Sequence, residues 1–210
     1  NVFSTPLFQQ PLELGADCVV YSATKHIDGQ GRCLGGVILC DEKFLADHLL
    51  SFIRNTGPSL SPFNAWVLVK SLETLDLRVR AMCEHAAALA DALSREPKVK
   101  RVVYPGRADH PQAALARKQM GLGGSLVTFE IDGGKEAAFR FSNALKLIDI
   151  SNNLGDAKSL ITHPATTTHY RLTPQARAEL GVSDGMMRLS VGLEDPADLT
   201  DDLSRALKAV

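Results

Sequence analysis

Residues 18–26 read Cys-Val-Val-Tyr-Ser-Ala-Thr-Lys-His, an apolar run that ends in two hydroxyl residues and a lysine. An apolar run without alternation is typical of a strand buried on both faces of a parallel sheet. Lys25, at the exit of this strand, can lose enough water to lower its pKa, which Schiff-base chemistry requires. Ser22 and Thr24 lie on the same side of an extended backbone as His26, where they could hydrogen-bond a phosphate. The stretch therefore indicates either a pyridoxal phosphate (PLP) site or an ordinary surface lysine after a buried strand.

The sequence on either side of this stretch predicts two strands and a helix. The apolar run gives a strand over residues 16–21, and a second apolar run gives another buried strand over residues 34–40. Asp41 is a good N-cap residue, so a helix is expected over residues 41–53.

A long helix is predicted to begin at Ser61, a good N-cap residue, followed by Pro62, which suits the first helical turn. Apolar residues then recur at helical spacing over about thirty residues, which is long for a helix in a globular protein. We therefore expect a break or bend within it, and a helix that bridges two domains. The predicted domains are residues 1–80 and residues 81–210.

The second predicted domain follows an α+β pattern of short strands and helices. Thr173 as N-cap and Pro174 at the next position mark the start of one of its helices. Strands are expected over residues 99–104, 125–131, 148–151, 159–162 and 187–191, and helices over residues 111–120, 135–147, 173–180 and 198–209.

Composition narrows the class of protein. A chain of 210 residues can bury a real core, and a net charge of −1 predicts no nucleic-acid partner and no acidic-membrane partner. No apolar run approaches the roughly 20 residues of a transmembrane helix. The four cysteines, Cys18, Cys33, Cys40 and Cys83, form no CxxC pair, so we expect buried thiols in a reducing cytoplasm and no disulfides.

Five segments of the chain carry long and specific motifs. They are NVFSTP (1–6), SATKHIDG (22–29), YPG followed by HP (104–111), SL followed by HPA (159–165) and RLSVGLED (188–195). In this order they resemble the Cys/Met-metabolism PLP enzymes, the cystathionine γ-synthase family. The resemblance covers essentially the whole chain. Among the subfamilies, the chain looks most like the O-succinylhomoserine sulfhydrylases.

The resemblance implies an α/β fold, the fold type I of PLP-dependent transferases (aspartate aminotransferase-like). Residues 1–80 would be the end of the PLP-binding large domain, and residues 81–210 the α+β C-terminal domain. Family members are about twice this length, so the chain resembles their C-terminal half. In the family, an aspartate directly before the position of Asn1 pairs with the pyridine nitrogen. An aromatic residue that stacks on the cofactor and a Gly-rich phosphate loop also belong to the other half, so the chain alone is expected not to form a complete active site.

The resemblance assigns the cofactor-binding roles to the stretch around the lysine. Lys25 would hold PLP as an imine, pass it to the substrate amine and then act as the proton-transfer base. Ser22 and Thr24 would bind the cofactor phosphate. The alternative for these two residues is ordinary polarity at a strand exit.

Substrate binding is assigned to Arg188 and Ser159. The planar guanidinium of Arg188 would grip an α-carboxylate, or would form a structural ion pair with Glu194 or Asp195. Ser159 would touch the substrate carboxylate and the lysine, or would cap a local turn.

Two other patterns are interpreted as structural. His163 and His169 lack a further ligand cluster, so hydrogen bonding is favoured over metal binding, and no metal site is predicted. Residues 121–124 are Gly-rich but precede a strand, which is not the arrangement of a dinucleotide-binding loop.

The implied activity is γ-replacement on an activated homoserine ester. O-Succinylhomoserine (or O-acetylhomoserine) and sulfide would give homocysteine and succinate (or acetate), in methionine biosynthesis. Cystathionine γ-synthase and methionine or cystathionine γ-lyase of the same family remain alternatives, as does an inactive C-terminal fragment that only self-associates. The implied partners are the amino-acid substrate, sulfide and further copies of the chain in a cytoplasmic homotetramer built from dimers.

Overall fold

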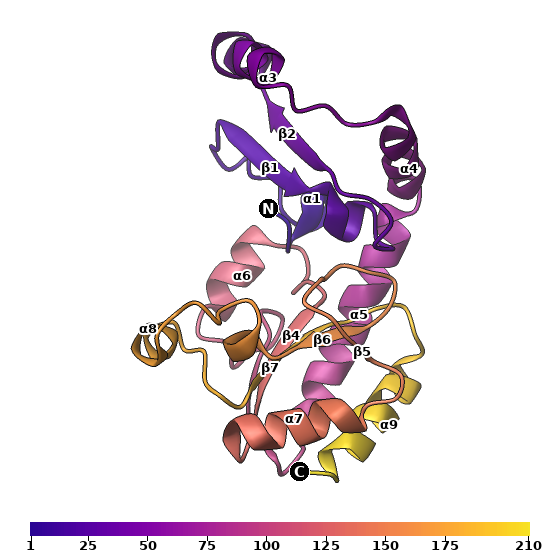
Figure 1. The fold of residues 1–210 in the computed structure, drawn as a ribbon, viewed down its shortest axis with the longest axis vertical. Helices are drawn as coiled ribbons and strands as arrows, with labels where there is room; N and C mark the ends of the chain where they lie inside the picture. Colours follow the sequence, from indigo (N-terminus) through magenta and orange to yellow (C-terminus); the bar gives the residue numbers. More distant parts are fainter.

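The computed structural model describes residues 1–210. The fold contains two separate β-sheets. The smaller sheet has two strands, β1 (Cys18–Ser22) and β2 (Gly36–Cys40), and the larger has five strands in the order β3-β4-β7-β6-β5. A long helix, α5 (Leu75–Leu93), runs beside the larger sheet and reaches toward the smaller one (Figure 1). This helix therefore links the two halves of the fold.

The lysine region, residues 1–72, consists of short helices around the small sheet. Two predicted caps are confirmed, because the Asp41 carboxylate accepts a hydrogen bond from the Phe44 N–H and the Ser61 hydroxyl accepts one from the Asn64 N–H. Each satisfies a backbone donor that the first turn of a helix leaves free. The helices are α1 (Thr5–Phe8), the π-helical turn η1 (Ala23–Ile27), the consecutive α2 (Glu42–Phe44), η2 (Leu45–Leu49) and α3 (Leu50–Thr56), and α4 (Pro62–Leu72).

The predicted break in the long apolar helix is confirmed. Helix α4 ends at Leu72 and α5 begins at Leu75. Thr74 at the junction has φ −114° and ψ 4°, outside the helical range. The predicted domain boundary near residue 80 stays a prediction, and α5 runs through that position without interruption.

The large-sheet region, residues 75–210, packs helices against its sheet. Strand β4 pairs antiparallel with β3 and β7, and β6 pairs antiparallel with β7 and parallel with β5. The predicted cap at Thr173 is confirmed, since its hydroxyl accepts a hydrogen bond from the Ala176 N–H. The elements after α5 are β3 (Val99–Val103), α6 (Ala113–Gln119), β4 (Leu126–Ile131), α7 (Gly134–Ala144), β5 (Asp149–Ile150), β6 (Leu160–Thr162), η3 (Pro164–Thr166), α8 (Pro174–Glu179), β7 (Met186–Ser190) and α9 (Pro196–Leu207).

The prediction of a parallel strand buried on both faces is wrong for β1 in this chain. Strand β1 pairs antiparallel with β2, and Cys18 lies opposite Cys40. Val19 and Tyr21 are buried, whereas Val20 between them is 59% exposed. An apolar run shows which side chains can be buried, but it does not specify the direction of the neighbouring strand. Val20 is exposed because successive side chains of a strand lie on opposite faces.

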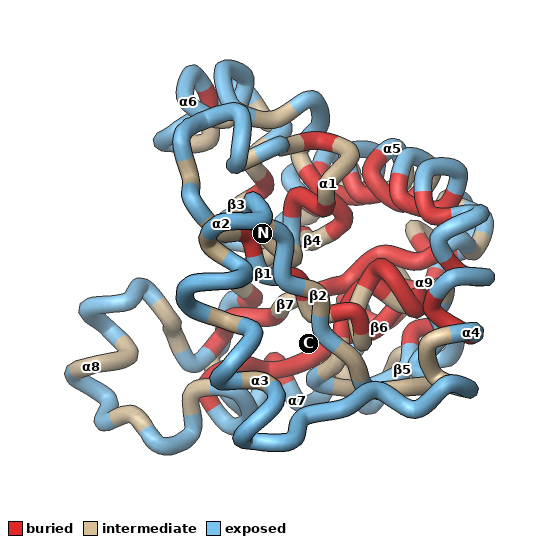
Figure 2. The backbone as a smooth tube through the Cα atoms, turned by 90° about the horizontal axis from the view of Figure 1, so that it is seen from above, coloured by how far each residue is buried: buried red, intermediate tan, exposed pale blue.

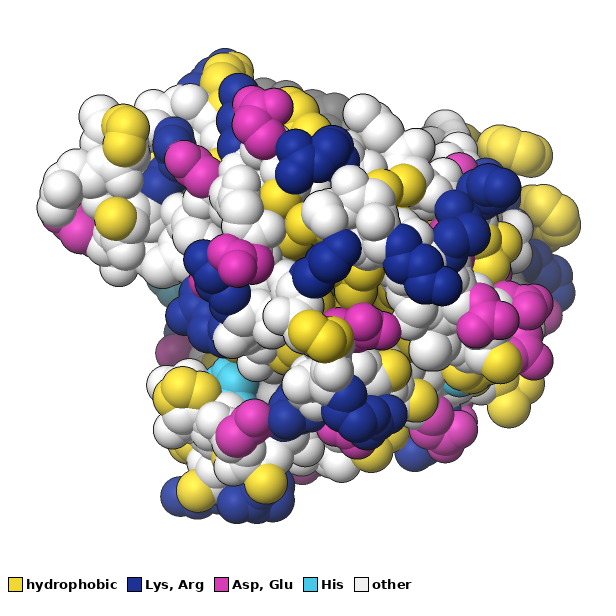
Figure 3. Space-filling view, turned by 90° about the horizontal axis from the view of Figure 1, so that it is seen from below, with side chains coloured by type: hydrophobic (Ala, Val, Ile, Leu, Met, Phe, Trp, Pro, Cys, Tyr) yellow, Lys and Arg dark blue, Asp and Glu magenta, His cyan; other side chains and the backbone are white.

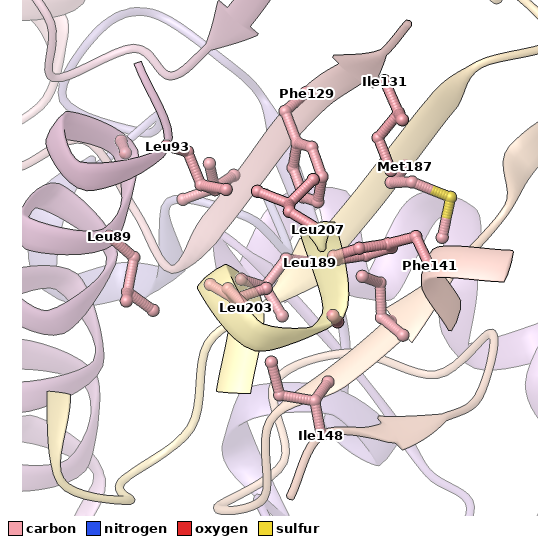
Figure 4. Close-up of a cluster of buried hydrophobic side chains, with 14 of the residues drawn as sticks. Leu89, Leu93, Phe129, Ile131, Phe141, Ile148, Met187, Leu189, Leu203 and Leu207 are labelled. Carbon is pink, nitrogen blue, oxygen red and sulfur yellow. The ribbon is translucent and has the colours of Figure 1, made fainter. Parts of the chain in front are cut away.

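The main hydrophobic core lies in the large-sheet region, where 20 buried residues form one cluster. Phe129 of β4 and Phe141 of α7 meet edge to face, with ring centroids 5.7 Å apart. Leu203 and Leu207 of α9 belong to the same buried cluster (Figure 4). The lysine region holds a cluster of only five buried residues, and Figure 2 shows most of its helical backbone as exposed. Strand β7 is therefore held in place by the large core, which includes its residues Met187 and Leu189.

The four cysteines are free thiols, of which Cys83 on α5 is buried and the other three are half-buried. Burial raises the pKa of the Cys83 thiol to about 12. None of the helices combines the length and the apolar character that crossing a bilayer demands.

Candidate active site

Lys25 lies in the π-helical turn η1, directly after strand β1. Its Nζ donates a hydrogen bond to Oδ1 of Asn153, which comes from the loop between β5 and β6. Burial, and then the positive charge of Arg188, lower the pKa of the Lys25 amine. A lysine in this setting has a larger neutral, nucleophilic fraction than a solvated lysine.

Arg188 projects from the middle of strand β7 and is half-buried. Its Nη2 donates a hydrogen bond of 2.9 Å to the backbone oxygen of Asn152, while its buried Nε has no hydrogen-bond partner. Neither Glu194 nor Asp195 pairs with it, which disfavours the structural ion pair considered from the sequence. Burial lowers the pKa of Arg188. A half-buried guanidinium with a free donor is well suited to bind a carboxylate.

Ser159 does not reach Lys25. It is fully buried, and its hydroxyl donates to the Glu194 carboxylate at 2.8 Å and accepts from the Gly192 N–H at 2.9 Å. The structure brings Asn153 to the lysine instead, a residue that the sequence reasoning passed over. The sequence has polar side chains at both ends of the segment 153–159, and a polar residue two positions before a turn glycine was the available signal.

The two predicted phosphate-binding hydroxyls lie at the start of η1 (Ala23–Ile27), the turn that carries Lys25 and is called the lysine turn below. Ser22 ends β1, and the Thr24 hydroxyl accepts a hydrogen bond of 3.1 Å from the Gly35 N–H. The expectation that Ser22, Thr24 and His26 share one side of an extended backbone is wrong, because the chain becomes helical at Ala23. His26 points into the interior, where its Nε2 lies 2.8 Å from the Ser125 hydroxyl.

The loop that carries Asn153 packs directly on the lysine turn. The Ala157 N–H donates a hydrogen bond of 2.7 Å to the Gly29 oxygen. Gly155 has φ +73°, and a Cβ built on it would lie 2.7 Å from the His26 backbone nitrogen. Glycine is required here by both conformation and space. This close packing fixes the position of Asn153 beside Lys25.

The two histidines considered as metal ligands make local hydrogen bonds. His163 contacts the Thr166 hydroxyl and the Asp184 backbone oxygen, both at 2.8 Å, and His169 contacts the Thr168 hydroxyl.

A cavity of about 610 Å³ lies along the edge of β3, and it contains none of the site residues described above.

The residues at this site fit PLP. Lys25 has an uncharged amide as its hydrogen-bond partner and a lowered pKa, which suits an amine that condenses with an aldehyde. The buried Nε of Arg188 lacks a partner within the chain, which suits an anionic amino acid bound beside the cofactor.

Comparison with curated proteins gives relatives of known activity. The chain is 54% identical over 211 residues to an O-succinylhomoserine sulfhydrylase of Mycobacterium tuberculosis, which covers 99% of this chain and 52% of that protein. It is 50% identical to the O-succinylhomoserine sulfhydrylase of Pseudomonas aeruginosa, over 100% of this chain and 52% of that protein. An L-methionine gamma-lyase of Pseudomonas putida is 46% identical, over 100% and 53%. The chain thus spans about half the length of the curated relatives it matches.

Solved structures agree with this relationship. A cystathionine gamma synthase from Xanthomonas oryzae pv. oryzae, in complex with aminoacrylate and cysteine, superposes with a TM-score of 0.95 at 39% identity, covering 100% of this chain and 54% of that one. The predicted fold type I of PLP-dependent transferases is therefore confirmed. The model of the Cys/Met metabolism PLP-dependent enzymes matches residues 1–208. The chain belongs to the family of Cys/Met metabolism PLP-dependent enzymes.

Proposed function

We propose that the protein to which this chain belongs catalyses PLP-dependent γ-replacement, in which sulfide displaces the acyl group of O-succinylhomoserine or O-acetylhomoserine. The observation that carries this proposal is that Lys25 binds Asn153 while Arg188 binds the neighbouring Asn152 and lowers the pKa of the lysine. The 54% and 50% identity to O-succinylhomoserine sulfhydrylases supports the choice of donor and nucleophile.

The residues divide the chemical work among them. Lys25 would hold the cofactor through its aldehyde, and its free amine would carry protons to and from the substrate carbons. Arg188 binds the substrate α-carboxylate and thereby aims the substrate at Lys25. Ser22 and Thr24 contribute hydroxyls to the phosphate site. Bound PLP supplies the electron sink that makes removal of the α and β protons feasible.

Asn153 is proposed as the residue that positions the Lys25 amine. Its amide oxygen accepts a hydrogen bond from Nζ, which orients the lysine without stabilising its charged form as a carboxylate would. Asn153→Ala should lower kcat by about tenfold while leaving cofactor attachment to Lys25 intact. An unchanged kcat in this variant would remove Asn153 from the proposal.

The role of Lys25 is tested on the full-length protein. Borohydride reduction in the presence of PLP should leave one pyridoxyl group on Lys25, which peptide mass spectrometry locates. Lys25→Ala should lose the group and lower turnover by about 1000-fold. Lys158→Ala is the matched control, since its side chain is 70% exposed on the neighbouring loop. A pyridoxyl group on another lysine would refute the assignment.

The products formed from each substrate pair distinguish a sulfhydrylase from a γ-synthase and a γ-lyase. Full-length enzyme receives each acylated homoserine with sulfide, with cysteine, or with no added nucleophile. Homocysteine from sulfide supports the proposed sulfhydrylase. Preferred formation of cystathionine from cysteine would indicate a γ-synthase, and release of 2-oxobutanoate and ammonia without a nucleophile would indicate a γ-lyase.

We further propose that the protein works as a cytoplasmic homo-oligomer, a tetramer built from dimers. Helix α4 supports this, because Phe63, Trp66 and Val69 are each more than half exposed along it. On the face in Figure 3, Lys and Arg side chains are interspersed with Asp and Glu, which supports small-molecule partners and not a nucleic acid. Analytical ultracentrifugation of full-length protein tests the tetramer. The present chain alone should associate with rising concentration without turnover.

A further inference from the structure

Arg78 of helix α5 contacts the backbone that follows the proposed catalytic lysine. The side chain is buried, with the residue only 8% exposed. Its Nη1 donates a hydrogen bond of 2.9 Å to the His26 oxygen, and its Nη2 donates one of 3.2 Å to the Ile27 oxygen. These are the first two residues after Lys25, so the guanidinium holds the exit of the lysine turn from 52 residues away in sequence.

The lysine turn needs such a partner at its end. The turn spans five residues and is kinked at Lys25, whose φ of −91° and ψ of −125° are not helical, and the last carbonyl groups of such a turn have no partner within it. The oxygens of Ala23 and Lys25 accept hydrogen bonds from the N–H groups of Asp28 and Gly29. The next carbonyl groups accept from Arg78, which caps the turn in the way that basic side chains cap helix C-termini.

Gly29 leaves room for this guanidinium. It has φ +68°, and a Cβ built on it would lie 2.0 Å from Nη1 of Arg78. The glycine four residues after Lys25 is therefore required by the arginine as well as by the left-handed backbone. The two positions, far apart in sequence, form one structural unit.

The other donors of Arg78 tie the turn to helix α4 and to its own helix. Nη2 also donates to the Ser71 oxygen at 2.9 Å, and Nε donates to the Thr74 hydroxyl at 3.1 Å. No carboxylate pairs directly with Arg78, because the nearby Asp28 carboxylate is bound by Arg32. The guanidinium therefore acts through its fixed fork of donors, a geometry that a lysine ammonium does not reproduce.

Helix α5 also contacts strand β4, which pairs with β7, the strand that carries Arg188. We propose that Arg78 is a positioning residue that fixes the lysine turn on α5 and so holds the Lys25 amine in place relative to Asn153 and Arg188. This inference rests on the proposed function, since it assumes that Lys25 carries the chemistry.

The test uses the full-length holoenzyme with Arg78→Lys and Arg78→Gln. The control is Arg80→Gln, two residues along α5, where the side chain is 54% exposed and pairs with Asp76. Both Arg78 variants should lower kcat by about 100-fold with a much smaller change in KM, because a displaced lysine misaligns the reacting atoms. The pH midpoint of the cofactor absorbance, which reports the Lys25–PLP linkage, should shift in both variants and not in Arg80→Gln.

A purely structural role gives a different result. Arg78 variants that melt at lower temperature but keep the kcat and the absorbance midpoint of the native enzyme would overturn the proposal. If neither Arg78 variant folds, Thr74→Val decides, since it removes one bond to the guanidinium and leaves both carbonyl contacts. It should shift the absorbance midpoint in the same direction by a smaller amount, and an unchanged midpoint would overturn the inference.

The two proposals fail in distinguishable ways. A pyridoxyl group absent from Lys25 in the native enzyme defeats the proposed function. A pyridoxyl group present on Lys25, together with unaltered kinetics in the Arg78 variants, defeats only the positioning role.

Discussion

The lysine region and the large-sheet region both contribute residues to the candidate site but differ sharply in how many apolar side chains they bury. The large-sheet region has a core of 20 buried residues, and the lysine region has one of five. Strand β2 has no fully buried residue, and Ile38 within it is 45% exposed. The reactive lysine therefore sits on the less buried side, and its partners Asn153 and Arg188 come from the better buried side.

This difference shows that the site depends on contacts between regions of unequal stability. Local stability in proteins follows the density of buried apolar contacts, so the lysine region should open more readily than the large sheet. Arg78 and the loop around Gly155 are among the contacts that join the two, together with the His26–Ser125 hydrogen bond. Four predictions test the contrast, from the largest expected effect to the smallest.

The largest effect is expected from truncating matched phenylalanines in the two regions. Phe141 is fully buried against Phe129, whereas Phe52 on α3 is 64% exposed. Phe141→Ala should reduce the free energy of unfolding by about 3–5 kcal/mol, because it leaves a cavity in a packed core. Phe52→Ala should change it by less than about 1 kcal/mol. Urea denaturation measures both values, and equal losses would contradict the contrast in burial.

The second prediction concerns pH and the lysine region. Burial, and then the charge of Arg78, lower the pKa of His26 from 6.5 to about 4. Between these values the unfolded chain binds a proton that the folded chain does not, so stability is complete above pH 6.5 and falls as the pH drops. The loss should reach about 3 kcal/mol by pH 4. The difference in unfolding free energy between the native chain and His26→Gln should shrink over this interval, and a constant difference would contradict the prediction.

The third prediction concerns a carboxylate of the large-sheet region. Burial raises the pKa of Asp202, but hydrogen bonds from the N–H groups of Leu147, Ile148 and Lys146, and the charge of Arg205, outweigh it and place the pKa below 3.8. Its stabilisation is therefore present above that pH and lost as the pH falls further. Asp202→Asn should cost about 2 kcal/mol at neutral pH. Its effect should disappear only at more acidic pH than the effect of His26, as followed by circular dichroism.

The smallest effect is expected from removing single hydroxyl groups. The Tyr104 hydroxyl is buried and shares its one proton between the oxygens of Gly124 and Cys83, at 3.0 and 3.2 Å, whereas the Tyr21 hydroxyl accepts one hydrogen bond from Asn1 in a partly buried setting. Tyr104→Phe should cost about 1 kcal/mol, and Tyr21→Phe should cost less. A larger loss at Tyr21 would show that the lysine region is more tightly held than its burial indicates.

Local features of the fold were predictable because they depend on neighbouring residues. The caps at Asp41, Ser61 and Thr173 and the break before Leu75 follow from side-chain type and from the length of an apolar stripe. The antiparallel pairing of β1 was not predictable, because hydrophobicity does not specify strand direction.

In the candidate site, too, some features were predictable from the sequence and others were not. By its residue types and motifs the sequence alone determined the family, the candidate lysine and the arginine at position 188. Only the tertiary structure decided that Asn153 and not Ser159 meets Lys25, and that Arg78 holds the lysine turn. The physical reason is the separation of the partners along the chain: 128 positions for the Lys25–Asn153 hydrogen bond and 52 for the Arg78–His26 hydrogen bond. Such bonds depend on how β7, α5 and the loop around Gly155 pack together, and no local pattern encodes that packing.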